Sequence, residues 1–150
     1  VTQVFCFLKD SQVLMEDGSR KSIQDIEPGD FVFGGGLVLI AGRAITDELF
    51  CHDGVFVSGS HSTFENGSWK KVRNSELAKS VDDDRHLVYN LVTANHLLVV
   101  GEKLYTDFVE FHGADLCSSE DEVIEKLNSD KTLAQDVQEK LDEFLYKKIQ

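Results

Sequence analysis

The amino-acid sequence predicts a mainly β-domain followed by a C-terminal α-helical extension. Before about residue 110, short apolar runs alternate with turn signals of the Asp-Gly, Pro-Gly and Asn-Gly type, and helical periodicity is scarce. After about residue 116, apolar residues recur at helical spacing among many charged ones. A chain of 150 residues has room for one such domain and its appendage.

The first hairpin is the clearest local element. Asp17 and Gly18 lie between the strand-like runs 13–15 and 21–23, a position where Asp-Gly is typical of a tight turn. A second turn follows at Pro28 and Gly29. Further strands are expected at residues 31–33, 37–40, 55–57, 69–72, 86–89 and 97–100, and one short helical turn at residues 75–79.

The C-terminal segment predicts a helical hairpin or a bent amphipathic helix. Ser119 and Glu122 have capping-box spacing, and Thr132 with Gln135 repeats it. The second apolar stripe consists of Leu133, Val137, Leu141, Phe144, Leu145 and Ile149. We therefore expect a flanking segment at residues 1–5, a β-domain at 6–110 and a helical extension at 118–150. The extension is expected to pack on the β-domain or on a partner in a host protein.

Charge and cysteine usage narrow the function classes. A net charge of -12 argues against nucleic acids and anionic membrane surfaces as partners, and no apolar run is long enough to span a membrane. Cys6, Cys51 and Cys117 lack disulfide-framework spacing, so we expect a reducing, cytoplasmic setting. Cys51 and His52 lack paired metal-ligand spacing, so no metal and no other cofactor is expected.

Cys6 is the candidate nucleophile. A cysteine can attack the carbonyl carbon of the preceding residue, here Phe5, and convert that amide into a thioester. The reaction needs a deprotonated thiol, a proton for the departing nitrogen and support for the developing oxyanion. Ser58 and His61 can supply part of this need. His61 would donate a proton to the Cys6 nitrogen, and Ser58 would hydrogen-bond the scissile peptide and fix its geometry.

Three sequence blocks occur in the order found in a known superfamily. They are Cys6 with the Asp17-Gly18 and Gly29-Asp30 turns, then Ser58, His61, Gly67 and Trp69, then Val88-Tyr89-Asn90-Leu91 with Asn95-His96. Over about residues 4–108 the chain therefore resembles the Hint superfamily of inteins, hedgehog autoprocessing domains and bacterial intein-like domains. The resemblance implies a horseshoe-like β fold. The stretch from Val72 to Leu87 is too short for a homing endonuclease, which implies a minimal module.

The resemblance also implies a function in which the flanking polypeptide is the substrate. The expected activity is a single-turnover, cysteine-dependent autoproteolysis. An N-to-S acyl shift at Phe5-Cys6 is followed by hydrolysis or thiolysis of the thioester. The implied catalytic residues are Cys6, Ser58, His61 and His96.

The late positions depart from the pattern of inteins, which end in His-Asn followed by a nucleophile. The corresponding positions here hold Thr106, Asp107 and Phe108. A carboxylate cyclises poorly because it lacks the amide nitrogen, and Phe108 offers no nucleophile, so full splicing is not expected. Asn90 also replaces the late-block aspartate, which predicts a slower reaction. The alternative is a catalytically silent Hint-like module for structure or interaction in a larger host, for which a viral or phage structural protein is a candidate.

Overall fold

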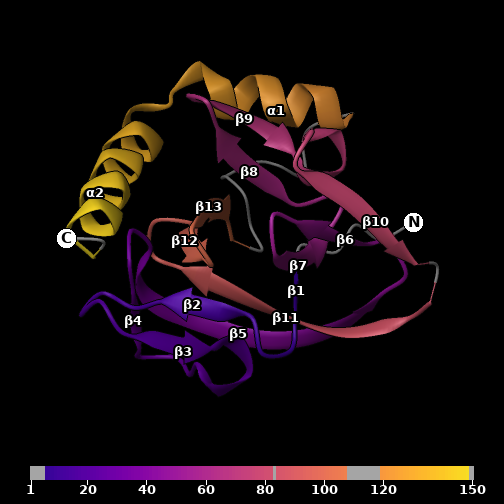
Figure 1. Cartoon of the computed structure of the whole chain (residues 1–150), viewed down its shortest axis with the longest axis horizontal. Coiled ribbons are helices and arrows are strands. Elements are labelled where there is room, and N and C mark those ends of the chain that lie inside the picture. The colour runs from indigo at the N-terminus through magenta and orange to yellow at the C-terminus, as the bar shows by residue number, and fades with distance from the viewer. Residues whose placement is uncertain (1–5, 83, 108–118, 149–150) are drawn as a thin grey trace.

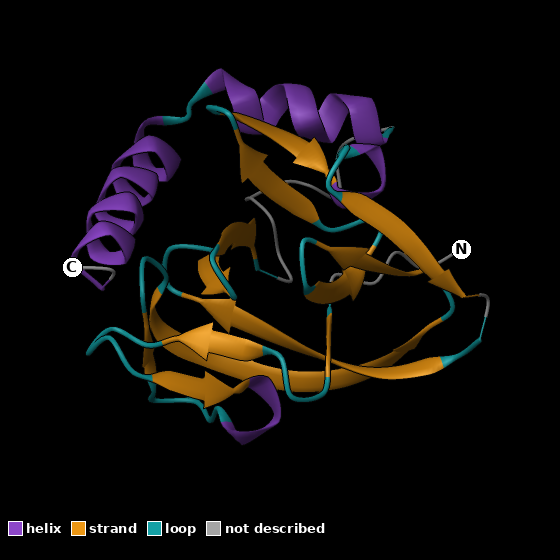
Figure 2. Ribbon diagram, viewed as in Figure 1, coloured by secondary structure: helices purple, strands orange, loops and turns teal. Residues whose placement is uncertain are grey.

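The computed structural model describes residues 6–82, 84–107 and 119–148. Within these residues the fold is mainly β, with two antiparallel sheets followed by two helices (Figures 1 and 2). The strands are β1 Phe7–Leu8, β2 Gln12–Leu14, β3 Arg20–Ser22, β4 Phe31–Val32, β5 Gly36–Thr46, β6 Leu49–His52, β7 Val55–Ser58, β8 Ser62–Glu65, β9 Ser68–Lys71, β10 Ala78–Asp82, β11 His86–Thr93, β12 Leu97–Val100 and β13 Lys103–Thr106. The helices are α1 Glu120–Ser129 and α2 Thr132–Lys148, with 3-10 turns at Ile23–Asp25 and Val72–Asn74.

The two sheets bring distant segments together. One has the strand order β10-β6-β7-β1-β11-β5-β4, and the other has the order β3-β2-β12-β13-β8-β9. The long β5–β11 ribbon runs along one side of the molecule in Figure 1. The first strand, β1, lies between β7 and β11. This central position places the residue before β1, Cys6, next to segments about 50 and 84 residues further along the chain.

The tight turns follow the local sequence. Glu65 and Ser68 are paired across the two-residue loop of Asn66 and Gly67, whose φ angles are 51° and 82°. Positive φ at both positions is what a type I′ hairpin turn requires, and Asn-Gly is the pair that adopts it most readily. Gly18 in the β2–β3 turn likewise has a φ of 88°. The hairpin predicted at Asp17 and Gly18 is therefore confirmed.

Several expected elements differ from the structure. The predicted helical turn at residues 75–79 is wrong, because the 3-10 turn lies at Val72–Asn74 and β10 begins at Ala78. The expected strand at 37–40 is the first part of a longer strand, β5, which continues to Thr46 because β11 pairs with it along that length. Strands β6, β8, β10 and β13 were not predicted. Each is short, and it is a strand because it pairs with a neighbouring strand, which its own sequence pattern does not indicate.

Two large clusters make up most of the apolar core, one within the β-domain and one beneath the helices. The first contains residues such as Phe7, Val57 and Tyr105. The second joins Leu14, Phe64, Trp69, Leu97, Val99 and Leu104 of the strands to Ala134, Val137 and Leu141 of α2. Burial of these side chains is the main stabilising contribution that fixes α2 on the domain.

The helical extension is also held by polar and close contacts. The Asn128 side chain accepts from the Trp69 backbone N–H at 2.7 Å and donates to its carbonyl at 3.1 Å. In Figure 1, α1 lies along the β8–β9 hairpin and α2 turns down beside β12. The Ser119 side chain caps α1 by accepting from the Glu122 N–H, as its capping-box spacing predicts.

The second helix differs from its sequence-based expectation at its start. Thr132 is the first residue of α2 rather than its cap, and its N–H is bound by the Asp130 side chain. Leu133, expected in the buried stripe, is 46% exposed, whereas Ala134 beside it is buried. The predicted boundary at residues 110–118 and the stripe member Ile149 lie outside the described residues.

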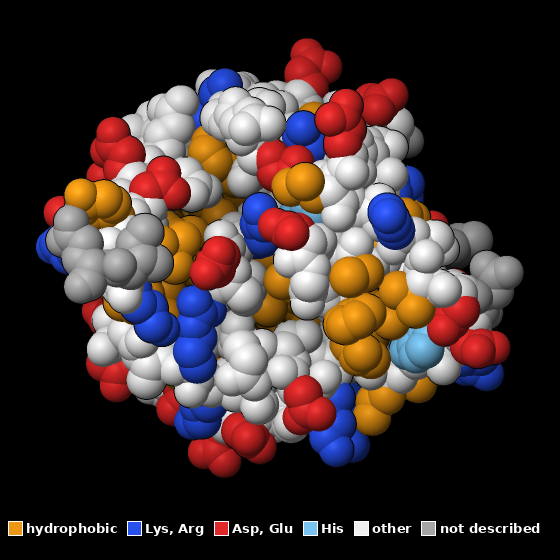
Figure 3. Space-filling model, in the orientation of Figure 1, with side chains coloured by type: hydrophobic (Ala, Val, Ile, Leu, Met, Phe, Trp, Pro, Cys, Tyr) orange, Lys and Arg blue, Asp and Glu red, His pale blue; other side chains and the backbone are white. Residues whose placement is uncertain are grey.

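The surface is mixed in charge. Figure 3 shows Asp and Glu side chains spread over one face, with Lys and Arg side chains among them. Within the described residues, no helix is both long enough and apolar enough to cross a membrane.

Candidate functional site

Cys6 is completely buried at the entrance to β1. Its backbone N–H donates to the Ser58 hydroxyl at 3.1 Å, and its carbonyl accepts from the Ser58 N–H at 3.0 Å. The Asn90 side-chain amide donates to the Cys6 sulfur at 3.5 Å. Both atoms of Cys6 that would change their bonding in an acyl shift, the nitrogen and the sulfur, are therefore engaged by side chains of other strands.

Sheet register explains this convergence. Phe7 pairs with Val57 on one side and with Tyr89 on the other. One residue earlier, the same register sets Cys6 between Ser58 and Asn90. Side chains directly opposite one another in antiparallel strands lie on the same face, so the three side chains form one row across β7, β1 and β11.

Ser58 and His61 are linked by a tight turn. The His61 N–H donates to the Ser58 carbonyl at 3.1 Å. This turn joins the end of β7 at Ser58 to the start of β8 at Ser62. The His61 Nε2 is paired with the Thr106 carbonyl oxygen. A carbonyl only accepts, so this contact requires the proton on Nε2. His61 therefore connects the Cys6 end of the site to the end of β13.

The surroundings of His61 are aromatic. The Phe7 ring lies 4.7 Å from the imidazole, centroid to centroid, and the Tyr105 ring meets it edge-on at 5.6 Å. Burial among these groups lowers the pKa of His61 to about 3, although the contact with the Thr106 carbonyl opposes the shift. The imidazole is thus neutral at physiological pH, and a neutral imidazole can both donate and accept a proton.

Burial acts on the thiol in the opposite direction. It raises the pKa of Cys6 to about 11, and the hydrogen bond from Asn90 partly offsets that rise. The resting thiol is therefore protonated at neutral pH. Any attack by sulfur requires proton removal at the moment of reaction.

The other end of the site is organised around a buried carboxylate. Asp107 Oδ2 accepts from the Thr93 N–H at 2.7 Å and lies 3.0 Å from His96 Nδ1. The Asp107 N–H donates to the His96 carbonyl at 3.0 Å. His96 has a φ of 58°, a left-handed conformation that a non-glycine residue adopts only where its surroundings hold it. These contacts tie the chain after β13 to the β11–β12 turn.

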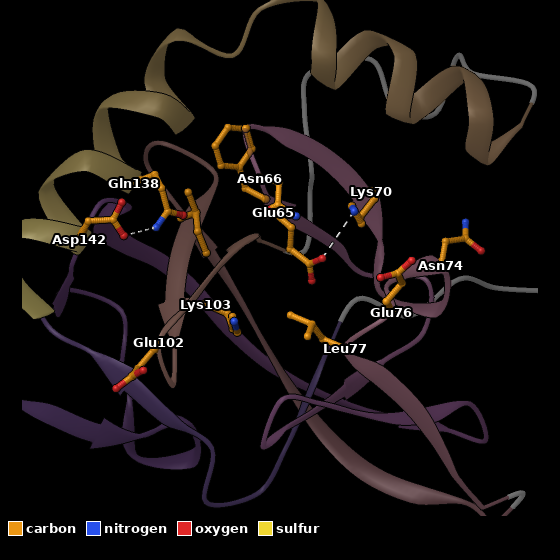
Figure 4. Close-up of a pocket in the computed structure, with 13 residues that line it drawn as sticks. Glu65, Asn66, Lys70, Asn74, Glu76, Leu77, Glu102, Lys103, Gln138 and Asp142 are labelled. Atoms are coloured by element: carbon orange, nitrogen blue, oxygen red, sulfur yellow. Dashed lines mark hydrogen bonds and ion pairs between the residues drawn. The ribbon is translucent and has the colours of Figure 1, made fainter.

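Two cavities lie near these elements without containing the Cys6 contacts. One of about 680 Å³ is bordered by Glu65, Lys70 and Lys103 from the sheet and by Gln138 and Asp142 from α2 (Figure 4). Cys6, Ser58 and His61 do not line it. A smaller cavity of about 250 Å³ lies between His96, Thr106 and the helices. The candidate chemistry is therefore assigned to the row of Ser58, Cys6 and Asn90 rather than to either of these cavities.

The side chain of His52, which follows Cys51, is held by hydrogen bonds to neighbouring side chains. His52 is buried, with Nδ1 2.7 Å from the Tyr105 hydroxyl and Nε2 paired with the Glu65 carboxylate. Cys51 is a free thiol. Across the described ranges, no cluster of three or more His, Cys, Asp or Glu side chains is arranged to hold a metal ion.

Several solved structures have a similar fold. A bacterial intein-like domain from Clostridium thermocellum has a TM-score of 0.58 at 18% identity, covering 71% of this chain and 99% of its own. The gp41-1 intein has a TM-score of 0.51 at 17% identity, covering 70% of this chain and 100% of its own. The AceL NrdHF class 3 split intein has a TM-score of 0.52 at 14% identity, covering 68% and 97%. No protein-family model and no curated protein sequence matches the chain.

The chain therefore has the intein-like Hint fold, with two C-terminal helices added. The resemblance predicted from the three sequence blocks is confirmed at the level of the fold. At sequence identities below 20%, similarity to these structures establishes the fold but not the activity.

The structure brings most of the predicted site residues into one region. Cys6, Ser58 and His61 are linked by the contacts given above, as are His96 and Asp107, and His61 meets Thr106. Phe5, the residue before the expected cleavage point, and Phe108 lie outside the described residues. Sequence reasoning missed Thr93, which binds the Asp107 carboxylate through its backbone N–H. A backbone donor leaves no signal in residue type, so only the pairing of β11 could have indicated it.

Proposed function

We propose that the chain is a self-processing domain whose own upstream peptide bond is its substrate. The Cys6 sulfur attacks the carbonyl carbon of Phe5, the new bond is S–C, and the bond to the Cys6 nitrogen breaks. The proton lost by sulfur is balanced by one gained by nitrogen. Water or an external thiol then attacks the thioester and releases the upstream segment.

The observation that carries this proposal is the pair of contacts at Cys6. Ser58 Oγ lies 3.1 Å from the nitrogen that must leave, and Asn90 Nδ2 lies 3.5 Å from the sulfur that must attack. The Ser58 hydroxyl accepts from the intact amide. The same hydroxyl can donate to the nitrogen once amide resonance is lost. The Asn90 amide can stabilise negative charge on sulfur.

His61 is proposed as the carrier of the proton between sulfur and nitrogen. Its lowered pKa leaves it neutral at physiological pH, so the imidazole has a nitrogen lone pair that can accept the thiol proton. A group with this pKa is a weak base, so the proton must pass on to the Cys6 nitrogen in the same step. Its contact with the Thr106 carbonyl fixes the ring between the two ends of the site. This role is distinct from that of a permanently charged acid.

Intact-mass spectrometry tests the proposal directly. A folded reporter domain is joined ahead of residue 1, and the fusion is incubated with and without dithiothreitol. The proposal predicts loss of the reporter mass by cleavage at Phe5-Cys6, faster with the thiol. A mass unchanged over days in a folded fusion would exclude it.

A second candidate function is a catalytically silent scaffold within a larger protein. It is favoured by the fully buried, protonated Cys6 thiol and by the Asp107 carboxylate, which is bound rather than placed to cyclise. The same mass measurement separates the two candidates, because a scaffold leaves the fusion intact with or without thiol.

A further inference from the structure

Gly42 occupies an unusual place in the middle of the long strand β5. It pairs directly with Asn90 of β11, which extends the row of Ser58, Cys6 and Asn90 by one strand. Its φ lies outside the left-handed region, so its backbone does not require glycine. Glycine in a strand interior weakens the strand and often marks a close approach by another group.

The group that approaches is the Asn90 side chain. A Cβ on Gly42 would lie 2.7 Å from Asn90 Oδ1 and 3.7 Å from Asn90 Nδ2. The same amide donates from Nδ2 to the Cys6 sulfur at 3.5 Å. The amide therefore lies across the space left by the missing side chain, with its oxygen over Gly42 and its nitrogen toward Cys6.

We propose that Gly42 is a positioning residue for the Cys6 thiol. Its missing Cβ provides the recess in which the Asn90 amide lies, and that placement directs the amide donor at the sulfur. Any effect of Gly42 on cleavage rests on the proposed function, because it requires that the chain cleaves itself. The effect on the thiol itself can be measured whether or not the chain cleaves.

The contact distinguishes this glycine from another glycine of the domain. At Gly35 a Cβ would lie 2.0 Å from the Leu97 backbone oxygen, so glycine is required there for two chain segments to pass. At Gly42 the nearest atom is the far end of a flexible side chain, which can swing aside. Alanine at Gly42 should therefore displace the Asn90 amide while leaving the strand pairing in place.

The test compares four variants of the full chain fused to the reporter: Gly42→Ala, Asn90→Ala, the double variant, and Ala41→Val as the matched control. Ala41 is the exposed neighbour of Gly42 on the same strand. Two quantities are measured in each: the cleavage rate, and the Cys6 thiol pKa from the ¹³Cβ chemical shift of a labelled cysteine. Thermal unfolding establishes that each variant is folded.

We expect Gly42→Ala and Asn90→Ala to slow cleavage by a similar factor of about fivefold, the size expected for one hydrogen bond. Both should raise the thiol pKa, because both remove the donor from the sulfur. The double variant should be no slower than Asn90→Ala alone, since the two changes remove the same contact. Ala41→Val should match the parent in both quantities.

The proposal is overturned if folded Gly42→Ala keeps the parent thiol pKa, or if the two single effects multiply in the double variant. These outcomes separate it from the proposed function. A chain that never cleaves but shows the paired shifts in thiol pKa would refute the function and support the positioning role. Cys6-dependent cleavage that is unaffected by Gly42→Ala, with an unchanged thiol pKa, would support the function and refute the positioning role.

Discussion

The two ends of the site differ in how their reactive groups are held. At the Cys6 end, two side chains contact the nitrogen and the sulfur of one residue, and each contact can change during a reaction. At the Asp107 end, the carboxylate is bound by a backbone N–H of β11 and by a histidine. The first arrangement suits bond exchange, whereas the second holds the Asp107 side chain in place.

This difference bears on the proposed self-processing, which uses the Cys6 end alone. His61 lies between the two ends, because its ring contacts Phe7 and its Nε2 is paired with the Thr106 carbonyl oxygen. We propose that the Asp107 end closes the β-domain without taking part in cleavage.

Loss of the nucleophile should have the largest effect. Cys6→Ala removes the sulfur that the proposed mechanism uses to form the thioester, so we expect cleavage of the reporter fusion to stop completely. Cys51→Ala is the matched control, because Cys51 is also a free thiol but lies on β6 away from these contacts. Cleavage that continues unchanged in Cys6→Ala would exclude Cys6 as the nucleophile.

The rate of cleavage should change little with pH near neutrality. The proposed step passes one proton from the Cys6 sulfur through His61 to the nitrogen, so it starts from the protonated thiol and the neutral imidazole and takes up no proton. Because burial raises the pKa of Cys6 to about 11 and lowers that of His61 to about 3, both groups keep these forms from about pH 5 to about pH 9. The rate of the acyl shift is measured with excess thiol across this range. A tenfold rise in rate for each pH unit, or a step near pH 6.5, would contradict proton transfer through a neutral His61.

Replacement of His61 should slow cleavage by about a hundredfold, the lower end of the range for general acid–base catalysis. His61→Gln is the useful variant, since its amide can still donate to the Thr106 carbonyl and support the fold. His86→Ala is the control, because that histidine pairs with Asp82 at the far end of the ribbon. Equal rates in His61→Gln and the parent would leave His61 with a structural role alone.

Changes at the Asp107 end should alter stability rather than cleavage. Asp107→Ala leaves the Thr93 N–H without its acceptor, so we expect the free energy of unfolding to fall by about 2 kcal/mol. The cleavage rate should change by less than about threefold. Asp53→Ala, which removes a surface pair with Lys103, should cost little. A folded Asp107→Ala variant that no longer cleaves would show that the two ends act together.

The sequence predicted the local features of this molecule better than the long-range ones. Asp17-Gly18 predicted its hairpin because few residues other than glycine adopt the positive φ that Gly18 has in this turn. The order of the three blocks indicated the fold. The helical turn predicted at residues 75–79 was wrong because β10 begins at Ala78 and pairs with β6, which is distant in sequence.

The site was predictable in its residue types and not in its contacts. Cys6, Ser58 and His61 were chosen from motif spacing, but the register that sets Asn90 beside the sulfur depends on the pairing of β1 with β11. Gly42 carried no signal, because a strand glycine gains meaning only from the side chain opposite it. Leu133 was misplaced because the face of α2 that is buried is set by packing against residues such as Trp69 and Leu97.

The chemical identity of the released reporter shows whether a thioester forms at Cys6. The fusion is incubated with 2-mercaptoethanesulfonate, and the products are analysed by intact mass and by fragmentation of the new carboxyl end. We expect a reporter ending at Phe5 as the thioester of that thiol, together with a domain that begins at Cys6. Release of only the free acid at another bond, or at the same bond from Cys6→Ala, would contradict thioester chemistry at Cys6.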